Sequence, residues 1–194
     1  AWYNPNSPAG QVARASWERW GVPLRPEDVA ELEYREGFLK RNAPLIAQWG
    51  ESNASSTYAG LYMDHRAGGK IRVGFNVDQA GQVAELEQQS GIDPDDRIEP
   101  FPYQPTRSSS YLEQLAKSFD QGISAQPEIG ELLTTASIDI PGNAVSIGAA
   151  NVTPVQAFII NRFGPDSGIS AHFDPSGPVR KTWLEEGVRA RPMN

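Results

Sequence analysis

Two matching stretches of sequence decide the fold: Met63-Asp64 followed by Ile71-Arg72-Val73-Gly74-Phe75, and Ile138-Asp139 followed by Val145-Ser146-Ile147-Gly148-Ala149. The gap inside each stretch holds turn-forming residues, Gly68-Gly69 in the first and Pro141-Gly142-Asn143 in the second. Residues of high β propensity on both sides of such a turn predict a β-hairpin. Because the two stretches match in sequence pattern and their hairpins differ by one residue in length, we interpret them as a degenerate internal duplication.

A helix is predicted after each hairpin. Asp78 stands at an N-cap position ahead of apolar residues at helical spacing, which predicts a helix over 79–90. In the second stretch, Thr153-Pro154 supplies a cap and a proline at the first helical position. The apolar stripe that follows runs from Val155 to Phe163 and predicts the second helix.

A strand is predicted after each helix, at 97–103 and at 168–174. Pro100 and Pro102 cannot donate to a hydrogen-bond ladder, so they limit the first of these strands to a sheet edge. The predicted fold class is α+β, with duplicated β-hairpin–helix–strand units. Each unit is expected to be a small, mainly antiparallel sheet packed on helices, and an N-terminal helical arm precedes them.

The expected domain organisation follows from these units. We expect an N-terminal arm and helices over 1–57, the first unit over 58–122, the second unit over 123–178 and a C-terminal tail over 179–194. A capping-box pattern at Ser110 opens a further helix within the first unit.

The N-terminal part is rich in proline and aromatic residues. We expect the first 25 residues to be an irregular arm in which Trp17 and Trp20 share one face of a short helical turn. A helix is predicted from Pro26, a residue that suits the first helical position. Pro44 divides this segment into a helix that ends near residue 42 and a second, short helix.

Composition excludes several classes of function. The chain has 194 residues, 24 acidic and 17 basic side chains and no cysteine, so thiolate metal sites, disulfides and cysteine nucleophiles are absent. A net charge of −7 argues against a nucleic-acid partner, because phosphate binding needs clustered Lys and Arg. No apolar run has the length of about 18 to 20 residues that crosses a bilayer, so we expect no membrane span.

The two histidines are the main candidates for chemistry, since each lies beside a carboxylate, in Asp64-His65 and in His172-Phe173-Asp174. Brought together, these residues could form a metal site or an acid–base pair. Nothing in the sequence brings them together, and solvated or locally hydrogen-bonded side chains are the favoured interpretation. We therefore expect no enzyme activity, no catalytic residue, no metal ligand and no cofactor.

The first unit resembles a known family. Its residues Tyr58-Ala59-Gly60-Leu61-Tyr62-Met63-Asp64-His65, the turn Gly68-Gly69-Lys70 and the strand Ile71-Arg72-Val73-Gly74-Phe75 resemble pro-regions of secreted actinobacterial serine proteases. These pro-regions precede the chymotrypsin-like domain in the streptogrisin and α-lytic protease group. The second unit is similar to their companion repeat, and the resemblance covers residues 58–175.

The resemblance implies a function without an enzymatic site. It implies a secreted or cell-envelope bacterial protein that acts as an intramolecular chaperone and inhibitor, with a downstream serine protease domain as its partner. The pro-region would template folding of the protease and inhibit it with a sheet edge and a tail. The residues expected at that interface are Ile169, Ala171, Phe173, Met193 and Asn194.

Two other functions remain open at this point. A stand-alone module of the cell envelope could bind a glycan or peptide through exposed aromatic residues. The candidates for that role are Trp2, Tyr3, Trp49, Tyr103 and Trp183. A hydrolase that uses the two histidines is the third alternative.

Overall fold

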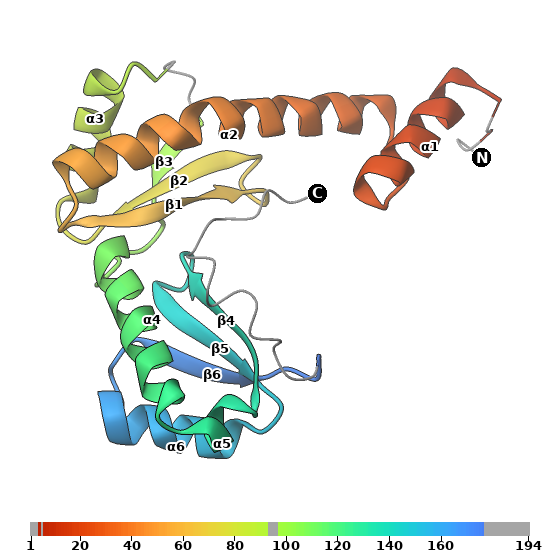
Figure 1. Ribbon diagram of the computed structural model, residues 1–194. Coiled ribbons are helices and arrows are strands. Elements are labelled where there is room, and N and C mark those ends of the chain that lie inside the picture. The colour runs from red at the N-terminus through yellow and green to blue at the C-terminus, as the bar shows by residue number, and fades with distance from the viewer. Residues whose placement is uncertain (1–3, 5, 93–96, 177–194) are drawn as a thin grey trace.

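The computed structural model describes residue 4 and residues 6–92 and 97–176, and its fold is α+β (Figure 1). Two small three-stranded sheets follow one another along the chain, each accompanied by helices. In order, the elements are α1 Pro8–Trp20, α2 Pro26–Asn53, β1 Tyr58–Asp64, β2 Lys70–Phe75, α3 Gln79–Gln89, β3 Ile98–Pro100, α4 Ser109–Ser124, α5 Pro127–Gly130, β4 Leu133–Asp139, β5 Ala144–Ala149, α6 Val152–Phe163 and β6 Ile169–Phe173. Among the described residues, no helix is long and apolar enough to cross a membrane.

Both predicted hairpins form, but each sheet is mixed rather than mainly antiparallel. β1 pairs antiparallel with β2, and β4 pairs antiparallel with β5. β3 then pairs parallel with β2, and β6 pairs parallel with β5. The helix between the strands explains this direction, because a helical crossover returns the chain to the starting end of the sheet. The third strand of each sheet is therefore an edge strand, as the prolines predicted for β3.

The two hairpins share their register as well as their order. Each has a one-residue shift near the start of its first strand, and the pairs that flank it are Tyr58–Phe75 and Gly60–Gly74 in one sheet, and Leu133–Ala149 and Thr135–Gly148 in the other. A shift of this kind bends the strand and increases its local twist. Its recurrence at the same place gives both sheets a bend at the same position.

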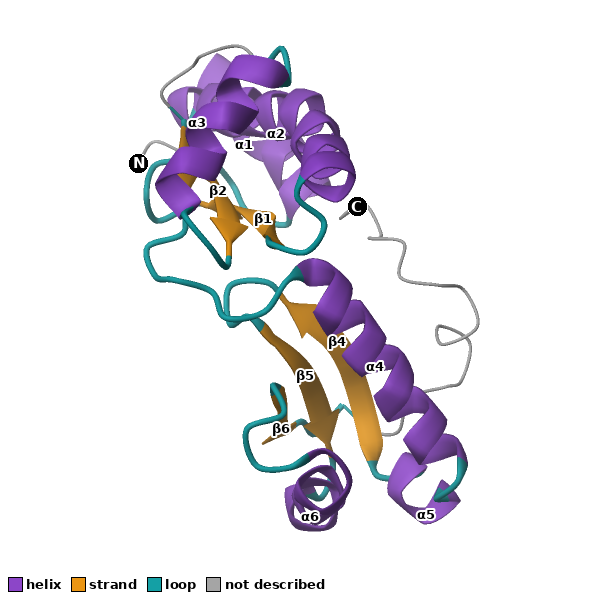
Figure 2. Cartoon of the chain, turned by 90° about the vertical axis from the view of Figure 1, so that its left-hand side faces the viewer, coloured by secondary structure: helices purple, strands orange, loops and turns teal. Residues whose placement is uncertain are grey.

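Each sheet has its own hydrophobic core, and these cores divide the chain differently from the expected boundaries at 57/58 and 122/123. α2 contributes Phe38 and Ile46 to the core of the first sheet. α4 contributes Leu112 and Phe119 to the core of the second sheet, along which it runs in Figure 2. The helix before each hairpin therefore packs with that hairpin, because an amphipathic helix must bury its apolar face against the nearest sheet.

The N-terminal segment is helical, so the expectation of an irregular arm was wrong. Ser7 caps α1, and its Oγ accepts a hydrogen bond of 3.0 Å from the Gly10 N–H. Trp17 is 59% exposed, whereas the Trp20 Nε1 donates to Glu36 at 2.8 Å. The signal was present in the sequence, since a serine cap followed by a proline marks the start of a helix.

α2 continues through Pro44 as one helix, so the predicted break there was also wrong. Proline lacks the N–H that would bond to the carbonyl four residues earlier, at Lys40. Both residues are exposed, so water can bond to that carbonyl and the helix does not have to end. The helix extends beyond β1 and β2 to reach α1 (Figure 1).

Gly74 and Gly148 occupy equivalent places in the central strands, and each leaves room for a side chain to pack directly over the strand backbone. A Cβ on Gly74 would overlap the ring of Phe101. A Cβ on Gly148 would overlap the Thr135 hydroxyl and lie 2.9 Å from Asp174 Oδ2. Each glycine therefore determines which side chains can pack on the face of its sheet that lies away from the helices.

Replacing Gly74 with alanine is expected to destabilise the protein by about 1–3 kcal/mol, because the Phe101 ring and the strand must move apart. Equilibrium unfolding in urea measures this change. The matched control is Gly37→Ala in α2, where the new Cβ would lie 3.3 Å from the flexible end of Arg41. That helical substitution is expected to stabilise the protein by up to about 1 kcal/mol. Equal stability of Gly74→Ala and wild type would show that the ring is not held against β2.

Candidate partner interface

β6 carries three of the residues predicted to contact a partner, and each has a different environment. Ile169 is buried in the core of the second sheet, Ala171 is half-buried and Phe173 is 66% exposed. These apolar side chains therefore anchor the start of β6 in the core, and the end of the strand lies at the surface. The other two predicted contacts, Met193 and Asn194, lie outside the described residues.

The outer edge of β6 presents backbone hydrogen-bonding groups. The strand pairs with β5 alone, to which the Gly168 carbonyl and the Asp174 N–H bond at 2.8 and 3.0 Å. Backbone groups alternate sides along a strand, so the even-numbered residues here face β5 and the odd-numbered residues face away. The N–H groups of Ala171 and Phe173 have no acceptor within the part of the chain that the structure describes.

Prolines obstruct the corresponding edge of the first sheet. The Arg97 carbonyl and the Phe101 N–H bond to β2, so the backbones of the even-numbered residues of β3 face outward. Two of these outward positions are Pro100 and Pro102, which have no N–H. Prolines of this kind prevent another chain from pairing with an edge strand. The two sheets share a topology but differ at the third strand: β6 has outward N–H groups at Ala171 and Phe173, whereas β3 keeps one, at Ile98, ahead of the two prolines.

A carboxylate fastens the end of β6 to the far strand of its sheet. The Asp174 Oδ2 accepts hydrogen bonds from Thr134 Oγ1 at 2.9 Å and Thr135 Oγ1 at 3.4 Å. The Oδ1 accepts bonds from the hydroxyl and the backbone N–H of Ser176. These bonds, that of the Ser176 hydroxyl first, lower the pKa of Asp174 to about 2. We name this group of four residues the Asp174 clasp.

The structure places the two histidines on different sheets. His65 follows β1 in the turn of the first hairpin, and His172 lies in β6. The His172 Nδ1 lies 3.4 Å from the Ser146 Oγ on the exposed face of the second sheet. Asp174 bonds to threonine and serine side chains instead of this ring. Within the described segments, no three His, Cys, Asp or Glu residues gather as a metal site requires.

The corresponding face of the first sheet carries a balanced network of charges. Arg72 bonds to Asp64 at 3.3 Å and to Glu99, which also pairs with Lys70. The Ala67 N–H is the first cause that lowers the pKa of Asp64, and Arg72 adds to it. The bond from Lys70 is the first cause that lowers the pKa of Glu99. Two cations and two carboxylates satisfy one another here, so the network offers no surplus charge to a ligand.

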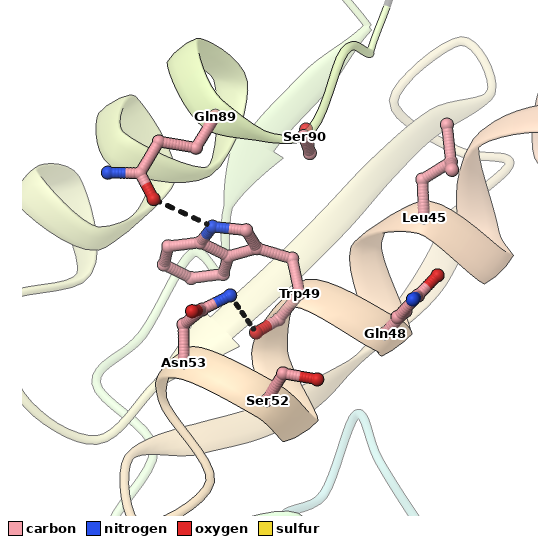
Figure 3. Close-up of a pocket in the computed structure, with 7 residues that line it drawn as sticks. All are labelled: Leu45, Gln48, Trp49, Ser52, Asn53, Gln89 and Ser90. Atoms are coloured by element: carbon pink, nitrogen blue, oxygen red, sulfur yellow. Dashed lines mark hydrogen bonds between the residues drawn. The ribbon is translucent and has the colours of Figure 1, made fainter.

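Two of the five aromatic residues named for the alternative binding module are described, and each forms a hydrogen bond within the chain. Trp49 is only 6% exposed, and its Nε1 donates to Gln89 at 3.3 Å beside a cavity of about 260 Å³ (Figure 3). The Tyr103 hydroxyl donates to the Pro141 carbonyl at 2.6 Å, and burial raises its pKa to about 12. The other three candidates lie outside the described residues: Trp2, Tyr3 and Trp183.

The sequence reasoning did not find the Asp174 clasp. It treated Asp174 as a neighbour of His172, whereas the carboxylate bonds across the sheet to Thr134 and Thr135. A signal was available in the alignment of the two stretches, where Gly148 matches Gly74 in the central strand. A glycine inside a strand indicates that another group approaches the backbone closely.

Comparisons with known proteins add no assignment. No protein-family model matches this chain, and no curated protein matches it.

Replacing Asp174 with asparagine is expected to destabilise the second sheet in a pH-dependent way. A carboxylate with a pKa lowered from 3.8 to about 2 adds stability above pH 3.8, and this stability is lost as the pH falls through about 2. Asp174→Asn should therefore lower the melting temperature at pH 7 and match wild type near pH 2. Thermal unfolding followed by circular dichroism at several pH values measures the difference.

The control for this series is Asp166→Asn. In the described part of the chain, the Asp166 side chain makes no hydrogen bond or ion pair, and only its backbone carbonyl is an acceptor. Its melting temperature should follow wild type at every pH. A constant difference between Asp174→Asn and wild type down to pH 2 would contradict a role for the charged carboxylate.

Proposed function

We propose that this chain is a non-catalytic pro-region or accessory domain of a secreted serine protease. It assists folding of the protease domain, inhibits it, or does both, outside the cell or in the cell envelope. The resemblance over residues 58–175 suggests this class, and the open edge of β6 supports it. The partner contributes a β-strand that pairs with the outward backbone groups of Ala171 and Phe173.

One observation carries the proposal: β6 has outward N–H groups along its free edge, whereas prolines obstruct the equivalent edge of β3. An exposed edge strand exposes a protein to aggregation, and proteins block such edges with proline. The third strand of the first sheet has this protection at Pro100 and directly after it at Pro102. An edge left open on the otherwise equivalent strand is the surface expected of a domain that adds a strand from a partner.

The physical mechanism follows from the cost of folding a β-rich protease. Long-range strand pairing is slow because loop-closure entropy is lost before contacts compensate for it. A preformed edge gives the incoming strand a partner at once and lowers this barrier. Binding to the folded protease also stabilises that state by mass action. The exposed ring of Phe173 supplies an apolar anchor at the end of the edge.

The shared register supports an origin of the two units by internal duplication. In this proposal, both copies kept the hairpin, the crossover helix and the parallel third strand. They diverged in the third strand, where the first copy acquired prolines and the second kept free N–H groups. The division of roles then follows: the first unit supports the second, and the second binds the partner.

Replacing Ala171 with proline tests the proposal. The substitution removes one outward N–H, and the first sheet shows that the fold accepts it, since Pro100 pairs with Val73 as Ala171 pairs with Ile147. The melting temperature should stay within a few degrees of wild type. Loss of that hydrogen bond, which leaves a carbonyl of the partner unpaired, should weaken assistance and inhibition by about tenfold.

The measurement is recovery of activity when an unfolded streptogrisin-type protease domain, or the protease domain encoded with this chain, is diluted into buffer with each variant at equal concentration. Ser170→Ala is the matched control, because its side chain is exposed and its backbone faces β5. It should act like wild type. If wild type neither speeds recovery nor inhibits the protease, the proposed function fails.

A further inference from the structure

The segment between the two sheets, residues 101–108, is bonded to both of them. On the side of the first sheet, the Phe101 N–H donates to the Val73 carbonyl at 3.1 Å. The Gln104 Nε2 donates to the carbonyl at the end of β2 at 2.8 Å. Segments that join independent domains are usually exposed and make few contacts. This segment is exposed at residues 102–104, but Phe101 and Gln104 bond it to the first sheet.

Asn143, in the turn between β4 and β5, holds the same segment from the other side. Its Oδ1 accepts hydrogen bonds from the backbone N–H groups of Thr106 and Arg107, both at 2.9 Å. Its Nδ2 donates to the Arg107 carbonyl at 2.8 Å. The side chain thus satisfies three backbone groups of the segment. Asn143 is only 4% exposed, so an unpaired group at this site would be costly.

Arg107 extends this connection to β6. Its Nη2 donates to the Asp166 carbonyl at 2.9 Å, in the loop that precedes the strand. Its guanidinium lies over Gly168, where a Cβ would overlap it. The segment held by Asn143 is therefore also bonded to the loop from which β6 begins.

The turn that carries Asn143 also contacts the first sheet directly. A Cβ on Gly60 would lie only 2.9 Å from Ile140 Cδ1, so the Ile140 side chain packs against β1. The Tyr103 hydroxyl donates to the Pro141 carbonyl at 2.6 Å. Contacts from the turn to the segment and to β1 thus converge at one place, at the junction of the two units in Figure 2.

We infer that Asn143 is a latch that makes the two sheets one cooperative unit and links the edge of β6 to the first sheet. A buried side chain that bonds three groups of the connecting segment couples the opening of one sheet to the opening of the other. A partner that stabilises β6 then also stabilises the first sheet. This inference does not depend on the identity of the partner.

Hydrogen exchange of the full chain, resolved for β2 and β5, tests the latch. In wild type, the most protected amides of both strands should exchange through a single global opening and respond equally to low urea. Asn143→Gly removes the side-chain bonds but keeps the left-handed backbone, where Asn143 has a φ of 48°. In this variant the protection of the two strands should separate by about tenfold or more.

Two further variants sharpen the result. Asn143→Asp keeps the acceptor for both N–H groups, so its two strands should still open together. Asn151→Gly changes an exposed asparagine that makes no capping bond, and it should leave the opening unchanged. The latch is overturned if the wild-type strands already exchange independently, or if Asn143→Gly lowers the protection of both strands equally.

Discussion

The parallel pairing of the third strand with the central strand is the constraint on which the rest of the molecule depends. It saturates β2 and β5 on both sides, so each sheet has only two edges. It also determines which residues of β3 and β6 have outward backbone groups. The core, the Asp174 clasp and the outward groups of β6 all follow from the parallel direction and the register of this strand pairing.

The two sheets share one strand topology but differ at the third strand and on the face that lies away from the helices. The first sheet is closed at its third strand by prolines, and its face away from the helices is filled by paired charges and by rings such as Phe101. The second sheet has hydroxyl groups and an imidazole on the equivalent face, and the outward N–H groups at its edge have no acceptor among the described residues. In the proposed function, the second unit would contact the partner, and the bonds of Asn143 would link that contact to the first unit.

Local rules made part of this structure predictable. The turn at Gly68-Gly69 and the edge position of Pro100 follow from backbone angles and missing donors, which act over a few residues. The continuity of α2 at Pro44 did not follow, because it depends on solvent at that face of the helix. The bond of Asp174 to Thr134 and that of Asn143 to Arg107 were missed for a related reason: they join residues 40 and 36 positions apart, which only packing brings together.

The exposed ring of Phe173 and the free edge beside it also affect the solubility of the chain. An exposed edge strand can pair with the same strand of another copy, so under the proposed function copies of this chain would compete with the partner for the edge of β6. The net charge of −7 opposes such pairing, because like-charged copies repel one another as they approach. The acidity that argues against a nucleic-acid partner thus also limits self-association at the edge of β6.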